Sequence, residues 1–93
     1  MTTFFMLGRY TSEGLKGITT ARTQKAKELV KELGGEIKSI HALLGEHDLV
    51  LIVDLPNLDN AVRASIQIGR MTGVTFSTCP AFSAEQFDKL TSG

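Results

Sequence analysis

The segment Asp48–Leu55 constrains the fold of this chain most strongly, because nearly all of its residues are aliphatic. Side chains alternate between the two faces of a strand, so the odd-numbered residues from 49 to 53 point one way while Val50 and Ile52 point the other. The segment therefore predicts a strand that is apolar on both faces. Pro56 ends this strand, since proline has no N–H to donate to a ladder.

The first third of the sequence predicts a strand, a loop and a helix. Thr3–Tyr10 is an aromatic and aliphatic run typical of a strand, and Thr11–Thr20 contains the Ser, Thr and Gly residues typical of a loop. From Thr20 to Leu33, apolar residues recur at the spacing of an amphipathic helix. The pair Gly34-Gly35 ends this helix, where a left-handed residue is needed.

The next segment, Glu36–Leu44, predicts a strand that forms a hairpin with the aliphatic strand. Gly45 and Glu46 lie between Leu44 and His47, and glycine in the first position suits a two-residue type II′ turn. Alternation places four residues of the strand Glu36–Leu44 on the same face, namely Ile37, Ser39, His41 and Leu43. The turn pairs Leu44 with His47, Leu43 with Asp48, and His41 with Val50.

The last third of the sequence predicts a helix, an edge strand and a short final helix. These are a helix capped by Asn57 and ended between Gly69 and Gly73, a strand Gly73–Phe82 placed at an edge by Pro80, and a helix Ala84–Leu90 capped by Ser83. The resulting order, βαββαβ with a short C-terminal helix, is that of a ferredoxin-like α+β fold.

Right-handed connections in this fold place the first and third strands in the centre of the antiparallel sheet and the second and fourth at its edges. The two long helices cover one face, whereas both central strands are apolar on both faces. An exposed aliphatic side chain forgoes about 1.5–3 kcal/mol relative to a buried one, so a second apolar face implies a partner. We therefore expect a homo-oligomer, a dimer or larger, that packs through the sheet.

Composition excludes several classes of protein. Ten Lys and Arg balance ten Asp and Glu, so neither a nucleic-acid partner nor a membrane-surface partner is expected. The apolar content of 42% excludes intrinsic disorder, and no apolar run reaches the length of a membrane span. Cys79 is the only cysteine, so no internal disulfide and no cysteine-based zinc site can form. We expect one cytoplasmic domain spanning residues 1–93, with neither metal nor cofactor.

The predicted pairing gathers polar residues at one corner of the sheet. The end of the first strand lies beside the start of the aliphatic strand, and His41 lies further along the hairpin. A histidine beside a carboxylate can act as a general base, so His41 and Asp48 are the candidate catalytic pair. The same groups could instead bind a divalent metal, or Asp48 could accept structural hydrogen bonds from the backbone or an arginine. The candidate ligand-binding residues are Arg9, Tyr10, Glu46 and His47.

The segment Gly45-Glu46-His47-Asp48-Leu49-Val50 resembles the signature of the GYD family, small prokaryotic proteins with Gly-x-Tyr-Asp before an aliphatic strand. Gly45 and Asp48 match this signature, whereas His47 occupies the tyrosine position. Other segments similar to the family are Thr11–Lys16, Glu32–Ile37, Leu55–Asn57 and Thr78–Glu85. The resemblance implies the architecture of the dimeric α+β barrel proteins, a group that includes cofactor-independent oxygenases, isomerases and ligand-sensing modules.

Three functions are compatible with these residues. The first is a small-molecule-binding homo-oligomer, with its pocket between sheet and helices or between subunits. The second is a cofactor-independent oxygenase or isomerase that uses His41 with Asp48 as base and Arg9 to hold an anionic or enolic substrate. The third is a structural oligomer without a ligand. Architecture alone does not choose among them.

Overall fold

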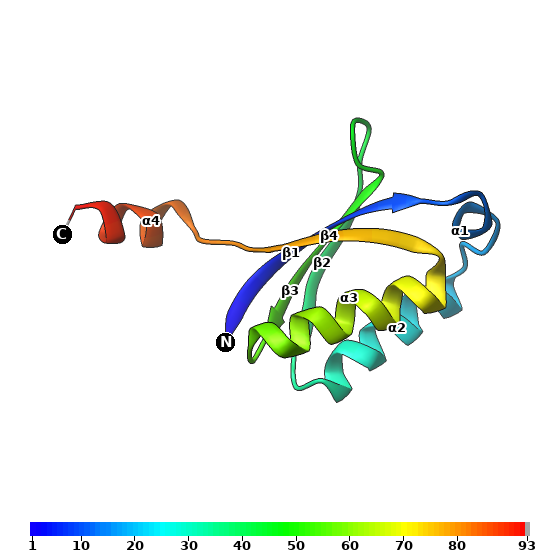
Figure 1. Ribbon diagram of the computed structural model, residues 1–93, viewed down its shortest axis with the longest axis horizontal. Coiled ribbons are helices and arrows are strands. Elements are labelled where there is room, and N and C mark those ends of the chain that lie inside the picture. Colours follow the sequence, from blue (N-terminus) through cyan, green and yellow to red (C-terminus); the bar gives the residue numbers. More distant parts are fainter. Residues whose placement is uncertain (93) are drawn as a thin grey trace.

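The computed structural model describes residues 1–92 and contains a four-stranded antiparallel sheet with the strand order β2-β3-β1-β4 (Figure 1). This arrangement confirms the predicted α+β fold, with the first and third strands in the centre. Strand β4 lies at one edge of the sheet, as predicted, and ends at Pro80, before the predicted end at Phe82. The elements are β1 (Thr2–Tyr10), α1 (Ser12–Lys16), α2 (Thr20–Glu32), β2 (Glu36–Ala42), β3 (Leu49–Leu55), α3 (Leu58–Thr72), β4 (Val74–Pro80) and α4 (Ala84–Thr91).

The segment predicted as a loop after β1 contains the short helix α1. The hydroxyl oxygen of Thr11 caps this helix by accepting a hydrogen bond from the N–H of Gly14 at 3.0 Å. The same hydroxyl donates to the carbonyl oxygen of Gly73 at 2.7 Å, which ties α1 to the end of α3. Ser and Thr favour both loops and helix caps, so the residues that suggest a loop serve here to start a helix.

Both long helices begin after a residue type that favours an N-cap and are followed by a glycine. Thr19 caps α2 and Asn57 caps α3, each accepting a backbone N–H in the first turn. Gly34 after α2 has a φ of 83° and Gly73 after α3 has a φ of 72°, in the left-handed region. Gly35 has a different constraint, because a Cβ there would overlap the carbonyl oxygen of Asp54 in β3.

The β2–β3 hairpin has the predicted register but not the predicted turn. The N–H of Leu43 donates to the carbonyl oxygen of Asp48 at 2.8 Å, and His41 pairs with Val50.

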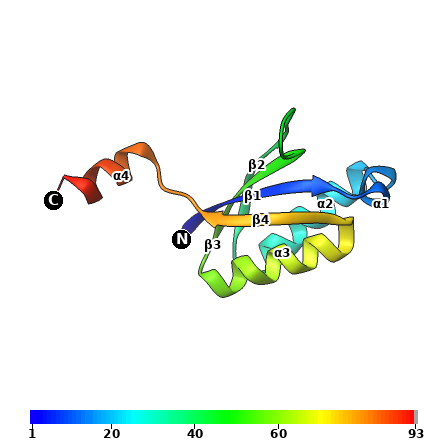
Figure 2. The same ribbon diagram turned by 45° about the horizontal axis from the view of Figure 1, so that its top comes forward.

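The turn differs from the prediction. A type II′ turn needs a positive φ at its first central residue, and Gly45 does not have one. The chain bends over residues 44–48 instead, so among the described residues Leu44 and His47 form no ladder pair. The tip of this hairpin extends beyond the other strands (Figure 2).

A β-bulge corrects the predicted alternation of β2. The register shifts between Ile37, which pairs with Val53, and Ser39, which pairs with Ile52. Ile37 therefore packs against the core, whereas Ser39 and His41 lie on the opposite face. Lys38 is the extra residue of the bulge, and its ammonium group lies 3.7 Å from a carboxylate oxygen of Asp54.

The core lies between one face of the sheet and helices α2 and α3, which sit together on that face (Figure 2). The opposite face, which we call the open face, carries no helix. At its centre Phe5 pairs with Ile52 and Leu7 pairs with Val50, so the predicted second apolar face is present. The buried core residues are Phe4, Met6, Ala26, Val30, Leu51, Val53, Leu55, Ala61, Ala64 and Ile68.

Helix α4 lies apart from the rest of the protein, beyond the end of the sheet (Figure 1). None of its described residues is buried. Within residues 1–92, every helix is too short or too polar to cross a membrane.

Candidate functional site

Asp48 joins the beginning of β3 to the end of β1. One of its carboxylate oxygens accepts a hydrogen bond from the backbone N–H of Tyr10 at 2.9 Å, and its own N–H donates to the carbonyl oxygen of Gly8 at 2.8 Å. Asp48 thus accepts a backbone hydrogen bond at a strand start, which is the structural alternative that the sequence left open for it.

Of the other predicted corner residues, Arg9, Glu46 and His47 lie at this corner, whereas the ring of Tyr10 lies on the face of the sheet that the helices cover. A guanidinium nitrogen of Arg9 lies 3.3 Å from a carboxylate oxygen of Glu46, and both side chains are largely exposed. Exposed ion pairs of this kind contribute about 0–1 kcal/mol. His47 is half-buried and lines a shallow hollow of about 140 Å³ together with Arg9 and Thr75. The corner is therefore a polar, solvated surface.

His41 lies on the open face, opposite Val50 of β3. Its side chain is exposed, and in the described chain no hydrogen bond joins that side chain to Asp48 or to any other residue. The catalytic pair of His41 and Asp48 stays a prediction. Within residues 1–92, no three His, Cys, Asp or Glu side chains come together as metal ligands would.

The hydrogen bond from Tyr10 to Asp48 gives a testable effect on stability. We expect Asp48→Ala to lower the free energy of unfolding by about 1–3 kcal/mol, because the half-buried end of β1 loses its acceptor. Asp48→Asn keeps an acceptor oxygen and should lower the free energy of unfolding clearly less than Asp48→Ala does. Urea unfolding of both variants measures the difference, and equal losses would contradict a hydrogen-bonding role.

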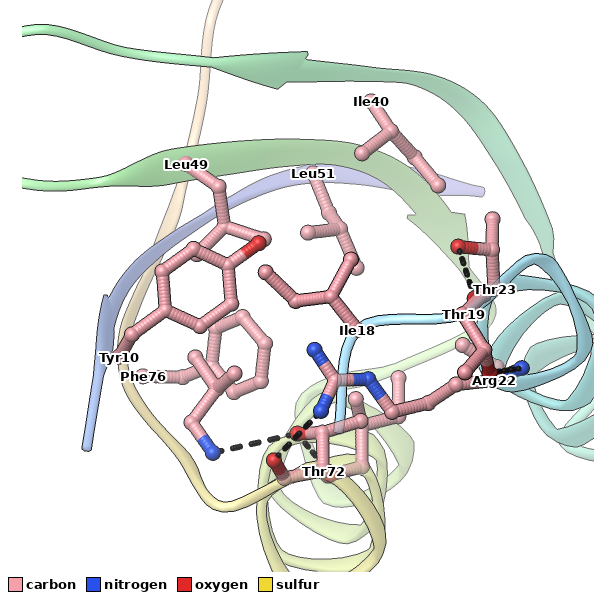
Figure 3. Close-up of a pocket in the computed structure, with 13 residues that line it drawn as sticks. Tyr10, Ile18, Thr19, Arg22, Thr23, Ile40, Leu49, Leu51, Thr72 and Phe76 are labelled. Atoms are coloured by element: carbon pink, nitrogen blue, oxygen red, sulfur yellow. Dashed lines mark hydrogen bonds between the residues drawn. The ribbon is translucent and has the colours of Figure 1, made fainter. Parts of the chain in front are cut away.

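A second candidate site lies between the sheet and the first turns of α2. It is a hollow of about 90 Å³ that is open to solvent. Figure 3 shows the rings of Tyr10 and Phe76 on one side of it and Arg22 on another. The lining comes from six elements and the α1–α2 loop, and consists of Tyr10, Ile18, Thr19, Arg22, Thr23, Ala26, Ile40, Leu49, Leu51, Ile68, Thr72, Val74 and Phe76. We call it the Arg22 hollow.

Arg22 is the one charged residue of this lining, and it is not among the residues predicted from the sequence. Its Nη1 donates to the carbonyl oxygens of Gly14 at 2.8 Å and Thr72 at 3.1 Å. Among the described residues, no acceptor pairs with Nε or Nη2, and Figure 3 shows the second terminal nitrogen pointing between Ile18 and Tyr10. The side chain is therefore held in place at one nitrogen and free to donate from the others.

A sequence signal for Arg22 does exist. It lies in the first turn of α2, which contains no acidic residue. The positive end of the helix dipole disfavours a cation there. An arginine at this position is therefore an exception to helix chemistry, and such exceptions often accompany function.

A larger hollow, of about 390 Å³, lies on the outside of α2 and β2. Its lining is mainly charged and polar side chains that water already solvates, including Lys27, Glu28, Lys31 and Glu36. The Arg22 hollow is smaller but mainly apolar, with few polar groups around it, which is the usual chemistry of a ligand site.

A comparison with models of protein families identifies the family of this chain. A model described as the GYD domain matches residues 4–91. The chain belongs to the GYD family. In this GYD protein the tyrosine position of the signature is taken by half-buried His47, and the aspartate position by Asp48, whose carboxylate holds the end of β1.

Solved structures with the same fold are similar to the GYD chain. A protein from Thermus thermophilus is 28% identical with a TM-score of 0.58, over 90% of this chain and 96% of that one. A transcriptional regulator is 14% identical with a TM-score of 0.69, and the leucine response regulatory protein of Mycobacterium tuberculosis is 12% identical with a TM-score of 0.59. The GYD chain matches 90% and 89% of its own length to these two regulators and spans about half of theirs, 52% and 51%. A comparison with curated proteins finds no match.

Proposed function

We propose that this GYD protein is a homo-oligomer that binds a small organic anion with an apolar part, such as a short-chain carboxylate, in the Arg22 hollow. The observation that carries the proposal is the free side of the Arg22 guanidinium above an apolar lining. Arginine donors form a planar fork that matches a carboxylate, and an apolar wall favours an aliphatic or aromatic tail beside it.

The volume of the Arg22 hollow and the hydroxyl groups in its lining narrow the class of ligand. A hollow of about 90 Å³ admits a few non-hydrogen atoms, with the rest of the ligand at its opening. The hydroxyl groups of Tyr10 and Thr19 lie in the lining and can donate to further oxygen atoms, whereas that of Thr23 already donates to the carbonyl oxygen of Thr19 at 3.5 Å. The regulator of Mycobacterium tuberculosis with the same fold is named for a response to leucine, a small carboxylate with an apolar side chain, and this supports the proposal.

The oligomeric part of the proposal rests on the open face. Its centre is formed by Phe5, Leu7, Val50 and Ile52, and Phe5 remains 38% exposed in the single chain. Polar residues, among them Arg9, lie around this centre. An apolar centre with a polar rim is the usual anatomy of a protein interface. A second copy of the chain supplies the same apolar surface and fits this face through two-fold symmetry.

Arg22→Leu tests the ligand site. With a panel of short-chain carboxylates, we expect at least one to raise the melting temperature of the wild-type protein, because a ligand at about 100 times its Kd adds about 2.7 kcal/mol of stability. Arg22→Leu should weaken binding roughly 10-fold or more, since a charge-assisted pair is lost. Isothermal titration with the responding ligand measures the loss.

Arg9→Leu is the matched control for this experiment. It removes the arginine of the sheet corner and leaves the Arg22 hollow untouched. We expect ligand affinity close to that of the wild type. Loss of binding in Arg9→Leu with retention in Arg22→Leu would instead assign the ligand to the corner. The enzymatic alternative has less support, because one Asp48 oxygen is already engaged by Tyr10.

A further inference from the structure

Helix α4 has an apolar side with nothing against it. Phe87 is 58% exposed and Leu90 is 70% exposed, and they lie three residues apart on one side of the helix. Glu85 and Asp88 lie on the opposite side. An amphipathic helix of this kind normally buries its apolar side, so α4 lacks a partner in the single chain.

The connection from β4 holds α4 away from its own chain. The N–H of Ala81 donates to the carbonyl oxygen of Thr3 at 2.8 Å, so pairing with β1 continues past the end of β4. Ser83 already caps α4, through a reciprocal pair of hydrogen bonds with Gln86. Only Phe82 lies between the last ladder bond and the cap. A reversal of direction within one residue would break the ladder bond or the cap.

A second unpartnered apolar surface lies on the outer side of α3. Leu58, Val62 and Ile66 follow one another at four-residue spacing and are 63%, 50% and 47% exposed. Together with Phe76 and Thr78 of β4, they line a groove of about 220 Å³, which we call the α3 groove. The hydroxyl groups of Ser65 and Thr78 in this groove are hydrogen-bonded to each other at 2.7 Å, so their polar atoms are already satisfied.

Helix α4 and the α3 groove match in length and in apolar character. The eight residues of α4 span about 12 Å, and so do the eight steps from Leu58 to Ile66, at about 1.5 Å per residue. Because the connection from β4 holds α4 away from its own chain, the groove of a second copy is the surface that fits this helix.

We propose that α4 of one copy docks in the α3 groove of a second copy, and that the second copy returns the same contact. The inference rests on the proposed homo-oligomer and adds to it a contact surface separate from the open face. Each protomer gives one helix and receives one, which is the reciprocal contact that two-fold symmetry produces. The docked helix buries Phe87 and Leu90 against the three exposed residues of α3.

Site-directed crosslinking tests the exchange. One chain carries Cys79→Ser and Leu90→Cys, the other carries Cys79→Ser and Val62→Cys, and the two are mixed, left to exchange subunits and treated with a short bismaleimide. We expect a covalent heterodimer on denaturing gels. In the control, Leu15→Cys replaces Val62→Cys in the second chain, because Leu15 is an exposed apolar residue of α1 outside the groove. This mixture should give at least 10-fold less dimer.

The double variant with Leu90→Cys and Val62→Cys in one chain distinguishes the outcomes. Intermolecular links, giving dimers, support the exchange, whereas an internal link in a monomer would overturn it. A non-covalent dimer whose crosslinked fraction is no higher than that of the Leu15→Cys control also contradicts the helix exchange, but it remains compatible with an oligomer formed through the open face. A wild-type protein that is monomeric at micromolar concentration in native mass spectrometry, with no crosslinks, rejects both. Adding Ile66→Glu to the chain with Val62→Cys should lower the crosslinked fraction at least 10-fold, because it places a charge in the groove and keeps the reacting thiol.

Discussion

Ile52→Glu is expected to convert the proposed homo-oligomer into a folded monomer. Ile52 lies at the centre of the open face, opposite Phe5, and takes no part in the core beneath the helices. In a two-fold interface each copy contributes one substituted residue. At about 2 kcal/mol for each, the dissociation constant should rise roughly 1000-fold. Native mass spectrometry of the variant and the wild type at equal concentration measures the change.

Leu15→Glu provides the matched control for Ile52→Glu. Leu15 is 57% exposed on α1, so the substitution adds the same charge at an apolar position outside the open face. We expect its oligomeric state to equal that of the wild type. Circular dichroism should give native spectra for both variants. An Ile52→Glu protein that stays assembled would reject the open face as the contact.

Gly35→Ala should destabilise the fold strongly, although it adds only one methyl group. The new Cβ would meet the carbonyl oxygen of Asp54 in β3, and it would also lie 2.7 Å from a methyl group of Leu55. A backbone atom cannot turn aside as a side chain can, so α2 and β3 must move apart. We expect a loss of about 2–4 kcal/mol in the free energy of unfolding. Thermal unfolding should show a melting temperature lower by roughly 10 °C or more.

Gly45→Ala is the comparison that isolates the steric cause. The same methyl group at Gly45 has no atom within 4 Å, and the backbone there does not have a positive φ. Its effect should be close to zero or slightly stabilising, because alanine restricts the unfolded chain. Equal losses in Gly35→Ala and Gly45→Ala would indicate a general loss of flexibility and would argue against the proposed overlap.

Much of the fold can be predicted from the sequence because its signals are local. Asn57 and Gly73 bracket α3, and the aliphatic residues before Pro56 define a central strand. The bulge at Lys38 has no such signal, since an extra residue leaves a strand's composition unchanged and shifts only the pairing. The turn predicted at Gly45 was wrong for a related reason, because a glycine permits a positive φ without requiring one.

The candidate sites also contain some contacts that the sequence predicts and others that it does not. Asp48 and Tyr10 could be brought together from the sequence, because the order of the strands fixes which ends meet. Arg22 could not, since its neighbours in the hollow come from six separate elements and the loop before α2. Contacts between a helix and distant strands depend on how the helix lies across the sheet, and the spacing of apolar residues gives only the side that it buries.

Both edges of the sheet resist the addition of another strand. Along β2, the bulge and the charged side chain of Lys38 interrupt the regular spacing that a new strand would need. At the end of β4, Pro80 has no N–H to offer. Features of this kind protect proteins against edge-to-edge aggregation. Copies of the chain can therefore expose a broad apolar surface while folding, with little risk of growing into fibres.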